Sequence, residues 1–361
     1  MAPKPLRVLV VDDSPLMRRM LSDLLAEAGL DVVGTASDGA ELEARVAELH
    51  PDVVTLDVEM PRMDGIAAVT RLMQTNPTPV VMVSSLTAEG ADATIRAMEA
   101  GAVDAIQKPQ ARTNRAAWLA IRDDLVGKLR AAAGARVSVM RSPTRIAKPA
   151  ATLSARARTT HQLVIIASST GGPRALSRVV PQLPTPLGAG VLLVQHMPVG
   201  FTTPLAARLN ASSPLKVREA RENDTIVPDT ALLAPAGSHL EVVGPGKVRL
   251  SHDPPIGALR PRADVTFASA AKHYGGNILC VVLTGMGNDG EAGIREVKKQ
   301  RGRVLTEDES TCVVYGMPRA VVEAGLSDAA FPLDAMAIAI VEMVAKGGVA
   351  PAETRPARAP S

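Results

Sequence analysis

Short apolar runs alternate with stretches of helical hydrophobic spacing through the first third of the chain. The runs, which predict buried strands, are residues 6–11, 32–36, 53–56, 80–83 and 105–106. The intervening stretches, which predict helices, begin at Pro15 and continue through Leu42 and Leu49, through Ile95 and Met98, and through Trp118 and Leu125. Strands that alternate with helices are typical of a parallel sheet with helices on both faces. The first domain is therefore expected to be a doubly wound α/β domain.

The same alternation resumes near Gln162. Apolar runs that predict strands occupy residues 163–167, 191–194 and 278–283. Two shorter segments, Leu240–Val243 and Val248–Ser251, flank the turn residues 244–246 and predict a β-hairpin. We therefore expect a second doubly wound α/β domain that carries a β-hairpin.

A basic stretch separates the two predicted domains. Residues 131–161 contain no acid and six cations, which are Arg136, Arg141, Arg145, Lys148, Arg156 and Arg158. The stretch is rich in Ala, Ser, Thr and Pro without a sustained apolar face, which predicts a flexible, solvated linker. The expected domains are therefore residues 1–130 and 162–347, and the proline-containing tail 348–361 is expected to be disordered.

Composition excludes several classes of protein. The chain has 361 residues and is 46% hydrophobic, enough for two buried cores, but its aromatic content is only 2%. No apolar stretch approaches the ~20 residues of a membrane span, and the N-terminus lacks the apolar region of a secretory signal. We therefore expect a cytoplasmic protein without membrane insertion. The basic linker has no aromatic side chains to stack on bases, so nucleic-acid binding is not expected.

Acidic residues gather at the ends of two predicted strands in the first domain. Asp12 and Asp13 follow the first strand, and Asp57 follows the third. Carboxylates at the shared edge of a parallel sheet suit Mg²⁺, which also binds phosphate oxygens. Asp57 could then accept a phosphoryl group, with Ser84 and Lys108 contacting its oxygens. The alternative for any one of these acids is a simple helix cap.

Three predicted strands of the second domain are followed by the residue types of nucleophilic catalysis. These residues are Ser169, His196 and Asp289. Because the carboxyl ends of parallel strands open onto one crevice, we expect the three side chains to converge. His196 would take the proton of Ser169, and Asp289 would orient the imidazole. The alternative is that Ser169 only caps the following helix.

The loop around Asp289 has a second interpretation. Gly285, Gly287 and Gly290 spell Gly-x-Gly-x-x-Gly after a strand and before a helix, and Glu307 ends the next predicted strand. This pattern is typical of dinucleotide binding. Asp289 weakens that interpretation, because a carboxylate inside the loop would repel pyrophosphate. A nucleotide-binding module remains an alternative to a hydrolase.

The first domain resembles the receiver domain of two-component response regulators over nearly its whole length, including the run Leu56–Gly65. The resemblance implies a flavodoxin-like fold that is phosphorylated in the presence of Mg²⁺. The residues it implies are the phosphorylation site Asp57, the metal ligands Asp13, Asp57 and the backbone carbonyl of Glu59, the neighbouring acid Asp12, and the phosphoryl contacts Ser84 and Lys108. In one respect the chain differs from such receivers: Ala105 occupies the position of their switching Tyr or Phe.

The two domains together resemble the chemotaxis response-regulator methylesterase family, also called protein-glutamate methylesterase/glutamine deamidase. The motifs that carry the resemblance are Ser169–Gly172, Gln195–Pro198, Leu283–Gly290 and Cys312–Pro318. Ser169, His196 and Asp289 fall on the catalytic triad of that family. Ala167 and Ser168 replace the usual Gly and Ala before the nucleophile, a departure that removes no reacting group.

The family resemblance implies a phosphorylation-regulated hydrolase of chemotaxis adaptation. Its substrates would be glutamate γ-methyl esters and glutamines of chemoreceptors, and a chemotaxis histidine kinase would supply the phosphoryl group. The catalytic domain would need no cofactor. Backbone N–H groups of Thr170 or Met286 are expected to form the oxyanion hole. A receiver-controlled DNA-binding regulator is the remaining alternative, but the chain lacks a helix-turn-helix signature.

Overall fold

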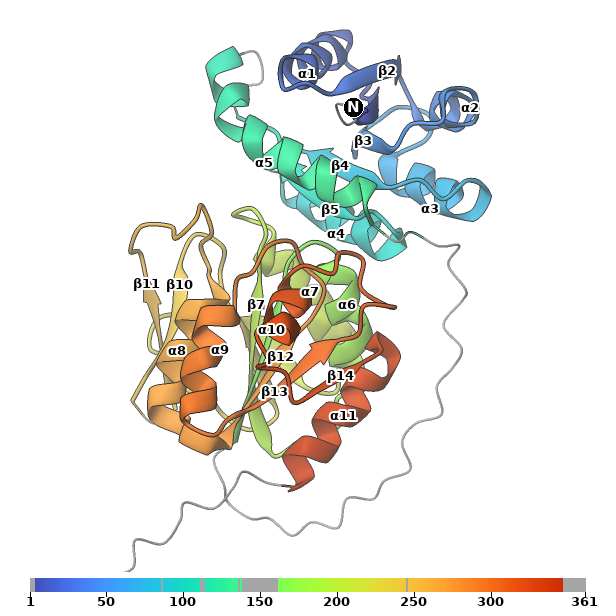
Figure 1. Ribbon diagram of the computed structural model, residues 1–361. Helices are drawn as coiled ribbons and strands as arrows, with labels where there is room; N and C mark the ends of the chain where they lie inside the picture. Colours follow the sequence, from blue (N-terminus) through green and yellow to red (C-terminus); the bar gives the residue numbers. More distant parts are fainter. Residues whose placement is uncertain are drawn as a thin grey trace, which may run out of the picture.

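The computed structural model describes residues 4–85, 87–110, 114–135, 137, 162–244 and 246–346. Two parallel sheets, each with helices on both faces, confirm the predicted α/β class (Figure 1). Most of the expected linker, residues 138–161, and the expected tail lie outside the described residues. Among the described helices, none has the length and apolar character needed to cross a membrane.

The N-terminal half has a five-stranded parallel sheet with the strand order β2-β1-β3-β4-β5. Its elements are β1 Arg7–Val11, α1 Pro15–Glu27, β2 Asp31–Ala36, α2 Gly39–Leu49, β3 Val53–Asp57, α3 Gly65–Thr75, β4 Val80–Ser84, α4 Ala88–Ala100, β5 Asp104–Gln107 and α5 Arg115–Ala133. The direction of winding reverses between β1 and β3, and ligands bind at such a switch point in doubly wound sheets. Asp12 and Asp57 lie at the ends of these two strands.

The C-terminal half has a seven-stranded parallel sheet with the order β14-β13-β12-β6-β7-β9-β8. Its strands are β6 Gln162–Ser168, β7 Ala189–Gln195, β8 Lys216–Glu219, β9 Thr230–Leu233, β12 Ile278–Val282, β13 Arg303–Glu307 and β14 Ala329–Phe331. Its helices are α6 Gly172–Val179, α7 Thr202–Ser212, α8 Ala263–Tyr274, α9 Glu291–Lys299, α10 Met317–Glu323 and α11 Leu333–Lys346, with short 3-10 turns η1 Val180–Gln182 and η2 Gly275–Asn277.

The central strand β6 determines where the site can form. It pairs with β7 on one side and with β12 on the other, so the loops that follow these three strands share one edge of the sheet. The interior positions of the three strands are buried because helices cover both faces of the sheet. This double burial explains why they appear in the sequence as continuous apolar runs and not as alternating ones.

The predicted hairpin is present as β10 His239–Val243 and β11 Lys247–Ser251, which form a separate antiparallel sheet. It packs on α8, where the Thr266 hydroxyl donates to Leu240 O at 2.7 Å and Ser269 accepts from Val242 N at 3.0 Å. Strands β8 and β9 were not predicted from the sequence. Strand β8 is short, lies at the sheet edge and alternates exposed charged residues with a single buried Val217, so it carries little periodic signal.

Helix α5 continues to Ala133, three residues past the expected domain boundary at residue 130. The reason is burial: Ala132 packs, fully buried, into the cluster that joins α5 to β1 and β3. A run of alanines has high helix propensity and shows no polar break where the domain ends.

The two halves are in direct contact through α4, which packs on α6 and α7 (Figure 1). Buried side chains of the N-terminal sheet, of α4 and of the C-terminal sheet belong to one continuous hydrophobic cluster. Examples are Met98 of α4, Leu176 of α6 and Leu205 of α7. The N-terminal half therefore covers part of the face that borders the ends of β6 and β7.

Candidate active site

Ser169 and His196 follow paired residues on neighbouring strands. Ser168 is the register partner of Gln195, so the residues that follow them lie side by side. The Gln195 amide fixes both loops: its Nε2 donates to Ser169 O at 2.9 Å and to His196 O at 2.8 Å, while its Oε1 accepts from Ser168 Oγ at 2.7 Å. A Cβ at Gly172 would lie 1.9 Å from the Gln195 Oε1, so only glycine permits this arrangement.

The imidazole of His196 is bonded to Asp289 from the loop after β12. Its Nε2 lies 2.7 Å from the Asp289 Oδ2, and both side chains are buried. The other ring nitrogen, Nδ1, is also buried and has no hydrogen-bond partner among the described residues. An ionised Asp289 accepts the Nε2 proton, which leaves a free lone pair on Nδ1.

Donors at the start of α8 surround the Asp289 carboxylate. It accepts from Ala263 N at 2.7 Å and Asp264 N at 3.0 Å, and the Arg262 guanidinium lies 3.3 Å away. Burial acts to raise the pKa of Asp289, but the hydrogen bonds from His196 and the backbone outweigh it and lower the pKa below its usual value. Asp289 is therefore ionised at neutral pH, as orienting an imidazolium requires.

The glycine-rich loop after β12 does not offer its helix terminus to a nucleotide. The Asp264 carboxylate accepts from Gly290 N at 2.9 Å and from Gly293 N at 2.8 Å, the free donors at the start of α9. These are the groups that would otherwise bind pyrophosphate. The same carboxylate forms a two-point ion pair with Arg262. Asp264 therefore anchors the loop that carries Asp289.

Glu307, the other element of the dinucleotide pattern, is fully buried below the nucleophile turn. Its carboxyl accepts from Thr284 N at 2.8 Å and from the Thr311 hydroxyl at 3.1 Å. Thr284 in turn accepts from Ser169 N through its carbonyl and donates its hydroxyl to Thr170 O. Glu307 therefore holds the Ser169 turn in place through Thr284, and it does not face a ribose site.

The two backbone N–H groups expected to form an oxyanion hole are both available, whereas a neighbouring one is occupied. Among the described residues, the N–H groups of Thr170 and Met286 have no hydrogen-bond acceptor. The N–H of Gly171 donates to Val103 O of the N-terminal half at 2.9 Å. The N-terminal half thus accepts a hydrogen bond directly from the turn that carries Ser169.

The acidic cluster of the N-terminal half forms as the sequence predicts. Carboxylate oxygens of Asp12, Asp13 and Asp57 lie within 4.8 Å of one another, a spacing that suits the ligands of one hard cation. The Lys108 ammonium bonds Asp57 at 2.6 Å and Asp12 at 2.8 Å. Burial raises the pKa of Asp57 to about 6, although Lys108 acts in the opposite direction.

The other predicted phosphoryl contacts surround this cluster. The Ser84 hydroxyl is buried and donates to carbonyls at Ser85 and Gly90, each at 3.2 Å. The Glu59 side chain accepts from the Ser85 hydroxyl at 3.1 Å, and its backbone N–H lies 3.4 Å from the Asp57 Oδ1. Ala105 is buried and offers no side chain that could swing toward Asp57.

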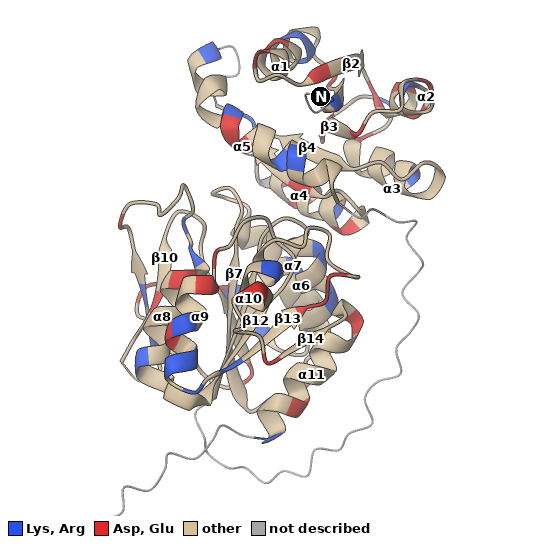
Figure 2. Cartoon of the chain, in the orientation of Figure 1, with Lys and Arg blue, Asp and Glu red and all other residues tan. Residues whose placement is uncertain are grey.

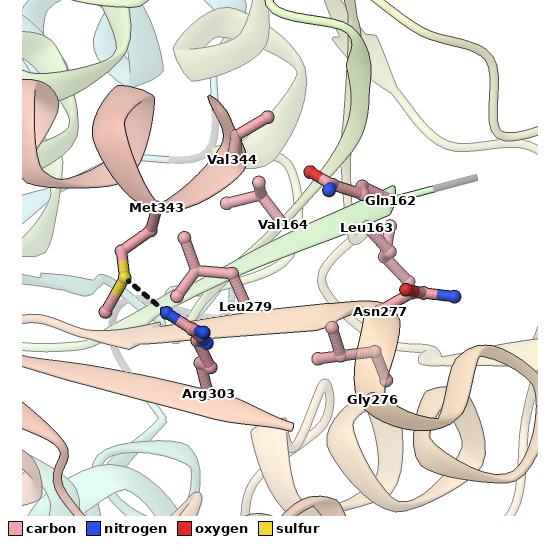
Figure 3. Close-up of a pocket in the computed structure, with 10 residues that line it drawn as sticks. Gln162, Leu163, Val164, Gly276, Asn277, Leu279, Arg303, Met343 and Val344 are labelled. Atoms are coloured by element: carbon pink, nitrogen blue, oxygen red, sulfur yellow. Dashed lines mark hydrogen bonds between the residues drawn. The ribbon is translucent and has the colours of Figure 1, made fainter. Parts of the chain in front are cut away.

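A pocket at the opposite edge of the catalytic sheet lacks comparable chemistry. It lies at the amino ends of β6 and β12, between Gln162, Asn277 and Arg303 (Figure 3). The Arg303 guanidinium points to the Met343 sulfur, and the remaining lining is largely apolar. Functional sites of doubly wound sheets lie at the carboxyl edge, so this pocket is not the active site.

Both halves of the chain match known protein families. Residues 164–340 match the CheB methylesterase family, and residues 8–117 match the response regulator receiver domain. A protein-glutamate methylesterase/protein-glutamine glutaminase of Symbiobacterium thermophilum is 46% identical over 95% of this chain and 98% of its own length. The chain belongs to this family.

Further members of the methylesterase/glutaminase family match with similar coverage. One from Archaeoglobus fulgidus is 41% identical over 89% of this chain and 93% of its own length. The crystal structure of the Thermotoga maritima CheB methylesterase catalytic domain is 41% identical, covers 51% of this chain and 98% of that domain, and has a TM-score of 0.49.

The sequence did not reveal the residues that support Ser169, His196 and Asp289. Gln195 was included in a motif but given no role, and Asp264, Arg262 and Thr284 were not singled out. The acid of the supposed ribose site, Glu307, proved to be a support of the nucleophile turn. A buried polar residue next to a strand end was the available signal, since such groups must find hydrogen-bond partners.

Replacing Arg262 should change the pH dependence of catalysis. Without this cation the His196–Asp289 pair binds a proton more readily, so Arg262→Gln should move the acid limb of the kcat/KM profile to higher pH and lower kcat/KM at pH 7 about tenfold. Arg249→Gln, which removes an exposed ion pair on β11, is the matched control. An unchanged midpoint, with kcat/KM lowered equally at every pH, would mean that Arg262 only maintains the fold.

Glu307 should make stability fall as pH rises. Its pKa is raised from 4.5 to about 7 in the folded state, so the neutral carboxyl favours folding below pH 4.5 and the benefit is lost as pH rises toward 7. The shift corresponds to at most about 3 kcal/mol. Urea denaturation at pH 5 and pH 8 should show a larger loss in the wild type than in Glu307→Gln. Equal losses in the two proteins would contradict the assignment, since Asp57 contributes equally to both.

Proposed function

We propose that the chain hydrolyses γ-methyl esters of glutamyl side chains on chemoreceptors and releases methanol. The observation that carries this proposal is the free, buried Nδ1 of His196, whose Nε2 is held by Asp289 and which follows the strand next to that of Ser169. A histidine with a fixed tautomer beside a serine is the arrangement that activates a hydroxyl nucleophile. The family membership supplies the substrate class.

In the proposed reaction, Ser169 Oγ attacks the ester carbonyl as its proton passes to Nδ1 of His196. The Nε2–H stays bonded to Asp289, which stabilises the imidazolium. The imidazolium then protonates the departing methoxide, and methanol leaves. Water, deprotonated by the same Nδ1, hydrolyses the glutamyl-enzyme and restores the serine. The N–H groups of Thr170 and Met286 are the proposed donors to the oxyanion.

The same site would deamidate receptor glutamines. A carboxamide carbonyl has the geometry of an ester carbonyl, and the attack by Ser169 is identical. The leaving group is ammonia, which is a poorer leaving group than methanol and depends more on protonation by His196. Ester hydrolysis should therefore be the faster of the two reactions.

The N-terminal half would control the reaction by phosphorylation at Asp57, with a chemotaxis histidine kinase as phosphodonor in the cytoplasm. Asp12, Asp13, Asp57 and the Glu59 carbonyl would hold Mg²⁺, which when bound offsets the charge of the incoming phosphoryl group. Lys108 and Ser84 would contact the phosphoryl oxygens. Lys108 is bonded to Asp57 before phosphorylation, so a new charge there must rearrange these contacts.

Inhibition in the unphosphorylated state follows from contacts at the nucleophile turn. The Val103 carbonyl of the receiver accepts a hydrogen bond from the Gly171 N–H. The Asp104 carboxylate of β5 accepts one from the Thr170 hydroxyl at 2.5 Å. A small pocket beside His196 is lined by Asp104 and Ala105 from the receiver and by Phe201, which precedes α7. A chemoreceptor cannot reach Ser169 until these contacts separate, and phosphorylation must favour the separated state.

Methanol release from methylated chemoreceptor membranes should depend on Ser169. The Ser169→Ala variant should lose at least about 10³-fold in rate, because no other group can form the acyl-enzyme. Ser212→Ala removes an exposed hydroxyl at the end of α7, away from the nucleophile, and should keep most of the activity. Equal activity of Ser169→Ala and the wild type would exclude the proposed mechanism.

Stimulation by a small-molecule phosphodonor with Mg²⁺ should depend on Asp57. The wild type should be activated several-fold, whereas the Asp57→Ala variant should show equal rates with and without the donor. A chain lacking residues 1–150 should be active without the donor, since the contacts to Gly171 and Thr170 are gone. An inactive fragment would mean that the receiver is needed to form the site.

A further inference from the structure

Acidic side chains of the receiver make all of its charged contacts with α6, α7 and the nucleophile turn among the described residues. Asp104 accepts from Thr170, and Glu99 accepts from the Ser177 hydroxyl of α6 at 2.9 Å. Arg208 of α7 bonds Glu99 and lies 3.6 Å from Asp92. The catalytic half contributes only hydroxyls and a cation to these contacts.

Helix α4 presents two of these acids along a single face, while Asp104 begins β5. Asp92 and Glu99 are seven residues apart, two turns of helix, and so project from the same side. Figure 2 shows acidic positions on α4 at the boundary between the halves, with basic positions on the α6 and α7 side. An acid-bearing helix is thus already seated on the catalytic half.

The surface under α4 leads directly to the nucleophile. Thr170 is the residue after Ser169, and Ser177 lies on the helix that begins immediately after this turn. Arg208 lies on the neighbouring helix, α7. Met98 of α4 and Asp104 of β5 line the pocket beside His196, so a segment bound in their place would approach the candidate catalytic residues.

We propose that Thr170, Ser177 and Arg208 form the docking surface for the substrate, an acid-bearing receptor helix, and that α4 together with Asp104 of β5 occupies this surface in its place. The inference rests on the proposed function. Each turnover converts an uncharged glutamyl ester into a glutamate, so a receptor segment that carries several such side chains presents carboxylates beside the remaining esters. Those carboxylates would bind the groups that Asp92 and Glu99 now contact, which are Ser177 and Arg208.

The fit of α4 to this surface is incomplete. The Nε of Arg208 is buried and has no hydrogen-bond acceptor among the described residues. A planar guanidinium can bind a carboxylate through two parallel hydrogen bonds, which α4 does not use fully. A receptor helix with a differently placed glutamate can satisfy the remaining donor. After phosphorylation, a receptor helix can therefore displace α4 from this surface.

The two partners of one ion pair separate docking from inhibition. Arg208→Ala and Glu99→Ala remove the same contact, but only Arg208 belongs to the docking surface. Without phosphodonor, both variants should hydrolyse N-acetylglutamate γ-methyl ester faster than the wild type. With phosphodonor and Mg²⁺, Glu99→Ala should keep the wild-type KM for methylated receptor membranes, whereas Arg208→Ala should raise that KM about fivefold with kcat unchanged, as expected for a partly exposed ion pair.

Two controls keep the test decisive. Arg208→Lys retains the cation and should keep KM for receptor membranes close to the wild-type value, and hydrolysis of the small ester shows that each variant is folded. Equal KM values for Arg208→Ala and Glu99→Ala in the phosphorylated state would overturn the proposal and leave Arg208 as an inhibitory contact alone. Absence of Ser169-dependent hydrolysis of either substrate by the wild type would overturn the proposed function, and this inference with it.

Discussion

A buried carboxylate must be surrounded by donors, and the requirement at Asp289 organises the catalytic half. Three sources meet it: the imidazole of His196, the backbone N–H groups at the start of α8, and the guanidinium of Arg262. Because these donors come from two separate segments, the loop after β7 and the start of α8, satisfying one charge fixes their relative positions. Asp264 extends the arrangement to the start of α9. The hydrogen bonds and the ion pair that the Asp289 carboxylate requires therefore fix the positions of the loops that form the site.

In the proposed mechanism, the receiver and the substrate exclude each other at the same edge of the sheet. The N–H of Thr170 is free within the described part of the chain, and the receiver accepts hydrogen bonds from the neighbouring Gly171 N–H and from the Thr170 hydroxyl. Hydrophobic burial through α4 adds to these polar contacts. Inhibition would therefore act at the turn that carries Ser169 itself.

Sequence reasoning predicted the strands, the hairpin and the chemistry-bearing loop positions because doubly buried parallel strands are continuous apolar runs. It missed strands β8 and β9, of which β8 has a single buried residue and gives no period. Helix α5 extends three residues past the expected domain boundary, within a run of alanines. Within the site, residues at strand ends were found, but Asp264 and Glu307 were not assigned their supporting roles. Their function depends on contacts between segments far apart in sequence, which local patterns do not encode.

The hydrogen bond from Gly171 N–H to Val103 O joins main chain to main chain. Neither group belongs to a side chain, so substitution of Val103 leaves the acceptor in place, whereas Gly171 has a positive φ and a Cβ there would lie 2.6 Å from Val313, so the donor position requires glycine. Side-chain contacts across the boundary can drift during evolution and retune the strength of inhibition. The hydrogen bond between Gly171 and Val103 persists as long as both backbones keep their conformation. In the proposed mechanism it would therefore maintain part of the inhibition even when the side chains at the boundary diverge.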